Sequence, residues 1–270
     1  SLQPGRMLEL FHSRRIHLMN KWKGCIGSLS VFWAGYLWSR RIAGETAAAS
    51  TFSAMGMSCA NSGFIGFPIL LIALPDVASN ALALNMIVEN LVMIPLVLIL
   101  AEYSRTNGAK GTDTVRTISK RLARNPIVIA LVLGLGISAS GLTLPSIISR
   151  PIDMFASASA AVSLAVIGGT LANLPLRAFK TAVFRITTGK LILHPLAVGV
   201  SLYGLSLIGF GVEDERLIAA AIVLSSTPVM AIYPILAQNY GEQKAASLAM
   251  LVMTAVSFLT VSVVLAITLN

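Results

Sequence analysis

Two long apolar segments of this 270-residue chain are interrupted by residues that break helices. The first interruption is the run NSGFIGFP at residues 61–68, and the second is SSTP at residues 225–228, followed by Pro234. Lipid offers no hydrogen bonds, so a broken helix persists at membrane depth only where its backbone is buried in protein or lines a wet cavity. Each interruption must therefore meet protein or water within the membrane.

The composition supports a membrane location. Of the residues, 56% are hydrophobic and only 11% are charged, whereas a soluble domain is typically about 25% charged. The net charge of +9 lies in short segments between apolar runs and not on a face interleaved with aromatic residues, which excludes nucleic acid as a partner. We therefore expect an all-α integral membrane protein.

Residues that support enzymatic, metal or redox chemistry are sparse. Cys25 and Cys59 lie in apolar segments without metal-ligand or redox spacing. The three histidines, His12, His17 and His194, share no local motif with a nucleophile, and no glycine-rich phosphate loop opens a helix. We expect no enzyme activity, no bound metal, and no cofactor beyond a coupling ion, either a proton or sodium.

A membrane-crossing helix needs about 20 mostly apolar residues, and the chain holds about eight candidates. The first is the weakest, because its apolar core is short and lies between Lys23 and Arg40. The candidate spans lie at residues 22–39, 46–74, 79–101, 125–144, 150–173, 182–210, 215–238 and 245–269.

Basic residues in short loops predict the orientation, because cytoplasmic loops carry the excess of lysine and arginine. The segment 102–124 holds six basic residues and is therefore predicted to be a basic cytoplasmic loop. Alternation of the spans then places Arg40 and Arg185 inside, and Asp76 and residues 213–215 outside. The basic N-terminal residues do not fit this alternation, so residues 1–21 stay unassigned.

The two halves of the chain have unequal numbers of spans. Aligning span 46–74 with span 215–238 also pairs 22–39 with 182–210 and 79–101 with 245–269. The spans at 125–144 and 150–173 then have no counterparts, so we expect an inverted 5+5 helix repeat from which two N-terminal helices are missing. Breaks at matching points of inverted repeats are typical of the binding site of a secondary transporter.

The order and spacing of several motifs resemble those of the auxin efflux carrier family, in its bacterial branch, and within that branch the malonate transporters. The match runs from about residue 24 to the end of the chain. The residues that carry it are NSGFIGFP at 61–68, Asn125-Pro126, Leu144-Pro145, IGGTL at 167–171, Lys190 with Pro195, Thr227-Pro228 and AQNYG at 237–241.

The resemblance implies a ten-helix fold shared with bile acid/sodium symporters. In that fold a mobile transport domain moves past a scaffold domain, and two broken helices, here 46–74 and 215–238, cross at the substrate site. The implied domains are 22–101 for the rest of the first repeat, within the transport domain, and 125–270 for the second repeat, with scaffold helices at 125–173 and transport-domain helices at 182–270.

The chemistry of the interruptions suits a small organic anion. A broken helix presents N–H groups and partial positive charge at the start of its second half, glycines let a ligand approach the backbone, and prolines free carbonyl groups. The alternative is that these small residues only allow close helix packing. The predicted substrate-binding residues are Asn61, Ser62, Gly63, Pro68, Ser226, Thr227 and Pro228.

Ionisable residues within spans are costly and usually functional. On span 79–101, Asn85, Glu89 and Asn90 are candidates for coupling or contact with the substrate. Glu89 either couples transport to protons or has a structural role. On span 182–210, Lys190 and His194 are candidates for contact with the substrate. For Lys190 we favour the alternative, extension to the cytoplasmic interface near Arg185, and for His194 the alternative is helix packing.

These observations predict a multi-pass inner-membrane protein that moves a small carboxylate, malonate or a similar dicarboxylate, by alternating access. The expected partners are this substrate and the lipid bilayer, and a homodimer is left open. Two other functions stay open: a sodium-coupled, bile acid-like symporter, and a truncated or regulatory membrane protein that does not transport.

Overall fold

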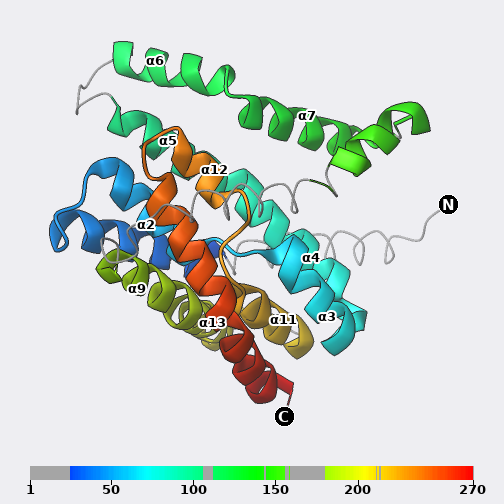
Figure 1. Cartoon of the computed structure of the whole chain (residues 1–270). Helices are drawn as coiled ribbons and strands as arrows, with labels where there is room; N and C mark the ends of the chain where they lie inside the picture. The colour runs from blue at the N-terminus through cyan, green and yellow to red at the C-terminus, as the bar shows by residue number, and fades with distance from the viewer. Residues whose placement is uncertain are drawn as a thin grey trace.

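The computed structural model describes residues 25–105, 112–142, 144–155, 158, 180–210, 212 and 214–269, and every regular element among them is a helix. Residues 25–41 and 146–155 are helical. The remaining elements (Figure 1) are α2 (Ala47–Ser58), η1 (Ser62–Gly66), α3 (Phe67–Ala73), α4 (Pro75–Val88), η2 (Glu89–Met93), α5 (Ile94–Ser104), α6 (Thr112–Ala123), α7 (Pro126–Ser140), α9 (Lys180–Thr188), η3 (Gly189–Leu193), α10 (His194–Leu205), η4 (Ser206–Phe210), α11 (Glu215–Ser226), α12 (Tyr233–Gln238) and α13 (Gln243–Leu269).

Within the described residues, four helical stretches are long and apolar enough to cross a membrane: Ala47–Ala73, Pro75–Ser104, Thr181–Gly209 and Gln243–Thr268. They correspond to four of the predicted spans. The described part of the chain is therefore all-helical and has the apolar spans of a multi-pass membrane protein, while the predicted count of eight spans is not confirmed.

The other predicted spans differ from a single long helix. The stretch 215–238 is divided into α11 and α12 by residues 227–232, which are not helical. Helix α7 has 15 residues, fewer than the roughly 20 that a span needs. Most of the predicted span 150–173 lies outside the described residues.

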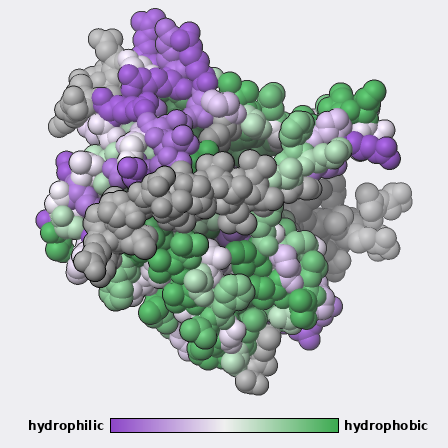
Figure 2. Space-filling model, viewed as in Figure 1, coloured by the Kyte–Doolittle hydropathy of each residue, from purple (hydrophilic) through white to green (hydrophobic). Residues whose placement is uncertain are grey.

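Helices α6 and α7 run in line along one side of the molecule, across the top of Figure 1, and α6 packs against α5. The segment 102–124, predicted to be a loop, is largely helical because α5 continues to Ser104 and α6 begins at Thr112. Figure 2 shows hydrophilic residues gathered over this end and a mostly hydrophobic surface over the lower bundle. That surface suits contact with lipid tails.

Three turns of π-helix each run directly into a helix that carries a proline in its first turn. They are η1 before Pro68, η2 before Pro95 and η3 before Pro195. Proline lacks an N–H, and its ring collides with the carbonyl one turn back. A widened π-turn relieves this collision and frees nearby backbone groups, and such turns occur frequently at functional sites.

Ion pairs join loops that the charge pattern predicts to lie on the same side of the membrane. At the predicted outer end, Arg216 forms an ion pair of 2.7 Å with Asp76. At the predicted inner end, Arg185 pairs with Glu45, which also accepts a hydrogen bond of 3.0 Å from the Ser53 hydroxyl. Each contact joins segments that alternation assigns to the same side, which agrees with the predicted grouping of the loops.

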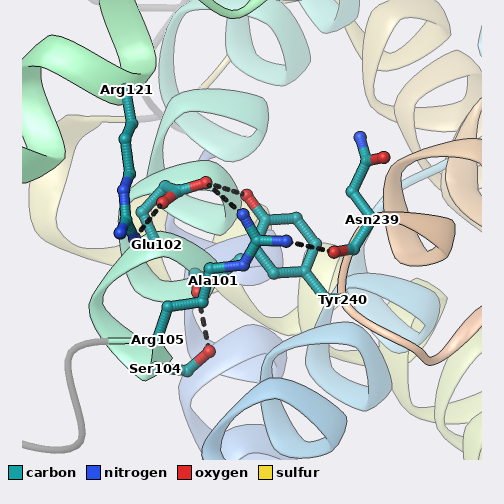
Figure 3. Close-up of polar contacts among 7 residues, drawn as sticks. All are labelled: Ala101, Glu102, Ser104, Arg105, Arg121, Asn239 and Tyr240. Carbon is teal, nitrogen blue, oxygen red and sulfur yellow. Dashed lines mark hydrogen bonds and ion pairs between the residues drawn. The ribbon is translucent and has the colours of Figure 1, made fainter.

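A second inner contact fixes the end of α12 to α5 and α6 (Figure 3). The buried Glu102 carboxylate accepts a hydrogen bond of 2.7 Å from the Tyr240 hydroxyl and forms ion pairs with Arg121 and Arg105 at 3.2 and 3.5 Å. The Arg105 guanidinium lies 4.5 Å from the centre of the Tyr240 ring and donates to the carbonyl of Asn239. Burial, and then the hydrogen bond to Glu102, raise the pKa of Tyr240, so its hydroxyl stays protonated as a donor.

We expect Tyr240→Phe to lower the stability of the protein, because it removes one donor from a buried carboxylate. The loss should be about 1 kcal/mol, since Glu102 keeps its two arginines, which corresponds to a fall of roughly 2–4 °C in the melting temperature, Tm. Thermal unfolding in detergent measures this. Tyr203→Phe is the matched control, because Tyr203 is 70% exposed; equal Tm values for the two variants would contradict the role given to Tyr240.

Candidate functional site

The two interruptions predicted from the sequence lie against each other inside the bundle. The backbone N–H of Asn61 donates a hydrogen bond of 2.7 Å to the carbonyl oxygen of Pro228. Asn61, Ser226 and Thr227 are buried. The first interruption thus supplies a donor and the second an acceptor, and the breaks are covered by protein, as the lipid environment requires.

Local sequence explains the shape of the first interruption. Helix α2 ends at Ser58, and Asn61 then caps the second half-helix through a 3.4 Å bond from the N–H of Phe64 to Oδ1. The carbonyl of Asn61 accepts the N–H groups of Ile65 and Gly66, which opens the π-turn η1. The first N–H groups of a helix have no partner within the helix, and here they belong to Ser62 and Gly63.

A buried carboxylate lies at this helix start. Glu89 Oε1 accepts a 2.7 Å bond from the N–H of Ala60, and Oε2 accepts a 3.3 Å bond from the Ser62 hydroxyl. The side-chain amide of Asn85 in turn donates to Ser62 Oγ at 2.5 Å. Negative charge is stabilised at a helix N-terminus by the backbone dipoles, so this end of the break already holds an anion supplied by the chain.

The second interruption presents the opposite polarity, the carbonyl end of α11. Pro228 has no N–H to continue the helix, and the Thr227 N–H and hydroxyl both turn back to the carbonyl of Leu224, at 3.2 and 2.8 Å. The Ser226 hydroxyl likewise donates to the carbonyl of Val223 at 2.7 Å. Both hydroxyl protons are therefore used within their own turn, so these two side chains can offer a ligand only the lone pairs of their oxygens.

A buried lysine, Lys190, binds the carbonyl end of α11. The Lys190 ammonium donates to the carbonyl of Ser225 at 2.6 Å and lies 2.8 Å from His194 Nδ1. On its other side, His194 Nε2 lies 2.9 Å from the Ser28 hydroxyl. Lys190 is 0% exposed, so the favoured expectation that it reaches the cytoplasmic interface is wrong. The π-turn η3 ahead of Pro195 turns it towards α11 instead.

The structure separates the predicted residues into those at the crossing and those away from it. Ser62, Asn85 and Glu89 form one connected group, Asn61 beside them bonds the carbonyl of Pro228, and Lys190 and His194 form a second group at Ser225. Two predicted residues lie away from both groups: Pro68 is exposed, and Asn90, on η2 beside Glu89, donates to Met86 Sδ at 3.5 Å. Gly63 is partly exposed and follows Ser62 at the start of the half-helix.

Two participants were missed at the sequence level. Ser28 contacts His194 across helices, and no spacing in the sequence indicates this contact. Ser225 contributes its carbonyl oxygen, which any residue could supply; the signal that would have found it is Pro228 three residues later, because proline ends the helix and leaves carbonyls open.

An apolar cleft leads from the predicted outer end of the molecule to the crossing. Its wall comes mainly from α4 and α11, with Leu202 from α10, and Asn85 is its polar member close to Ser62. Among the described residues no cluster of three or more His, Cys, Asp or Glu side chains could hold a metal ion. The lining residues are Ala81, Leu84, Asn85, Val88, Leu202, Val212, Leu217, Ile218, Ala221 and Leu224.

Comparison with known proteins identifies the family. Residues 23–265 match the family described as "Membrane transport protein", so the chain belongs to that family. It is 28% identical, over 219 residues, to a Rhizobium meliloti (strain 1021) protein named "Putative malonate transporter", a match that covers 81% of this chain and 67% of that protein. The resemblance to auxin efflux carriers and malonate transporters is thereby confirmed.

We expect Gly66→Ala to disturb the crossing more than Gly63→Ala. A methyl group on Gly66 would lie 2.5 Å from Leu224 Cδ2, on a side chain that is 1% exposed, and overpacking of this kind costs about 1–3 kcal/mol. A methyl group on Gly63 meets only the flexible end of Met86 at 3.1 Å, and alanine in a helix gains about 0.5–1 kcal/mol over glycine. Tm values in detergent measure both; a Gly66→Ala protein as stable as Gly63→Ala would show that the interruptions do not pack closely.

Proposed function

We propose that the chain is a secondary transporter of a small carboxylate, with malonate or a similar dicarboxylate as substrate. One observation supports this most strongly: the start of the second half-helix of the first interruption already binds a carboxylate, that of Glu89. A site that holds one carboxylate through a backbone N–H and a hydroxyl has the chemistry to hold another. The name of the Rhizobium meliloti relative supports malonate as the first candidate.

In this proposal the substrate enters through the apolar cleft and meets Asn85, Ser62 and the backbone N–H of Gly63. The amide of Asn85 can donate to a carboxylate, and Asn61 keeps the half-helix in place by capping it. Apolar walls keep water away and strengthen these hydrogen bonds. Ser226 and Thr227 shape the second interruption and do not donate to the substrate, because their hydroxyl protons are already engaged.

Glu89 and an anionic substrate repel each other at the same helix start, and this gives a route to proton coupling. When Glu89 takes up a proton, its negative charge is lost and the carboxylate of the substrate can bind; release of that proton on the other side of the membrane restores the repulsion. Two like charges about 4 Å apart repel by roughly 4 kcal/mol at an effective dielectric constant of 20. In this proposal Glu89 is the group that carries the coupled proton.

For the whole protein, we propose transport by alternating access in the inner membrane, in which the crossing moves relative to a scaffold. The cleft gives access from the outer side, and the Glu102 contacts with Tyr240 hold the inner end of the second broken helix in the state that the structure describes.

Malonate should raise the Tm of the wild-type protein, because a ligand that binds the folded state stabilises it. We expect Asn85→Ala to weaken the apparent Kd about 10- to 100-fold, the effect of losing one hydrogen bond to a charged group. Asn90→Ala is the matched control, because Asn90 is on the same span but bonds only Met86. Malonamide, which has the shape of malonate without its charges, should leave the Tm unchanged; an equal effect of both ligands would contradict a carboxylate site.

The coupling role of Glu89 predicts a specific loss in Glu89→Gln. Glutamine keeps an oxygen that can accept the N–H of Ala60 but cannot take up and release a proton. Malonate uptake into proteoliposomes should rise with an inward proton gradient for the wild type, and should no longer respond to the gradient in Glu89→Gln. Asp76→Asn, a change at an exposed carboxylate, should keep the response; a gradient response that survives in Glu89→Gln would rule Glu89 out as the coupling group.

A further inference from the structure

The side chain of Lys190 ends at the broken carbonyl end of α11. Its ammonium donates to the carbonyl of Ser225 at 2.6 Å, within the last turn of the helix, and it is fully buried. The neighbouring carbonyls of Val223 and Leu224 accept hydrogen bonds from the hydroxyls of Ser226 and Thr227. Lys190 donates to the next carbonyl along the helix, that of Ser225.

A cation at this position is expected on electrostatic grounds. The carbonyl end of a helix carries partial negative charge. In transporters with broken helices, the exposed carbonyls of such an end coordinate the coupling sodium ion. Here the end is occupied by the side-chain amino group of Lys190, which is covalently part of the chain.

The surroundings of Lys190 also fix its position. His194, one turn later on the same helix, lies 2.8 Å from the ammonium and 3.1 Å from the Ser225 carbonyl oxygen through Nδ1, and Ser28 lies 2.9 Å from His194 Nε2. If Lys190 is protonated, it donates to Nδ1, and the ring then donates its other proton to Ser28. The distances thus describe a row of donors and acceptors that ends at the α11 carbonyl and holds the ammonium there.

The two charges at the crossing are each bound to backbone. Glu89 binds the N–H end of one broken helix, and Lys190 binds the carbonyl end of the other. Glu89 has no ion pair with Lys190 within 4.0 Å; the ion pairs among the described residues join other side chains. Each charge therefore compensates a helix end.

We infer that the Lys190 ammonium is the resident cation of the second interruption and takes the place of a sodium ion, so that this protein binds no sodium there and transports independently of sodium. The statement about transport rests on the proposed function, whereas the statement about the cation site does not. It predicts that removing the ammonium creates a binding site for a small external cation at the Ser225 carbonyl.

Thermal unfolding of the full chain without substrate tests the cation site. Lys190→Ala removes three methylene groups and the ammonium, the atoms that n-propylammonium can replace. We expect a lower Tm for Lys190→Ala in choline chloride, and a rise of about 3–5 °C for each tenfold increase in n-propylammonium or sodium once binding is established. 1-Propanol, which has a similar shape but no charge, should not restore the Tm.

Matched variants separate this role from a general loss of packing. Lys190→Met fills the space without a charge, so its Tm should be lower and should not respond to either cation. Lys244→Ala, at an exposed lysine, should behave like the wild type. The wild type itself should have the same Tm in sodium chloride and choline chloride at equal ionic strength.

Two results would overturn the inference. One is a sodium-specific rise in the Tm of the wild type, which would show that a sodium ion binds while Lys190 is present. The other is a folded Lys190→Ala protein whose Tm responds to neither cation. If Lys190→Ala does not fold, its purification in n-propylammonium decides: recovery of folded protein supports the inference, and no recovery overturns it. Because no substrate is present, failure of malonate to bind would not affect any of these outcomes.

Discussion

The hydrogen bond from the Asn61 N–H to the Pro228 carbonyl is the contact on which the rest of the crossing depends. Two helices that break inside a membrane expose donors and acceptors that lipid cannot satisfy, at a cost of several kcal/mol for each group. Placing the breaks against each other satisfies one donor with one acceptor. Other backbone groups at the breaks bind polar side chains instead. Glu89 accepts a hydrogen bond from the N–H of Ala60, and Lys190 donates one to the carbonyl of Ser225.

Prolines determine where these side chains point. Each of the π-turns η1, η2 and η3 precedes a proline, and together they contain Ser62, Glu89 and Lys190. A π-turn adds a residue to the turn and rotates the side chains before it relative to those after it. Two buried clusters of apolar residues, one centred on α2, α5 and α13 and the other on α3, α4 and α11, hold the helices on which these turns lie.

The sequence predicted the backbone breaks well because their cause is local. Asn61, the glycines and Pro228 interrupt apolar runs, and the absence of hydrogen bonds from lipid makes burial of those breaks a necessity. It predicted side-chain direction poorly. Lys190 was assigned to the interface from its distance to Arg185 along the chain, and Asn90 was grouped with Glu89 because it is adjacent, although the regular helical period does not hold through η2 and η3. The contact of Ser28 with His194 depends on tertiary packing alone.

The two bound charges also suggest why an anion would be carried. With Glu89 ionised and Lys190 protonated, the crossing has no net charge; protonation of Glu89 leaves the charge of Lys190 uncompensated. In the proposed mechanism the site thus becomes positive at the moment when its carboxylate position becomes free, and both changes favour an incoming carboxylate. A sodium ion at the second break could leave together with the substrate, but a lysine cannot. The positive charge therefore remains with the protein through the cycle, and the proton on Glu89 is the only ion that has to move with the substrate.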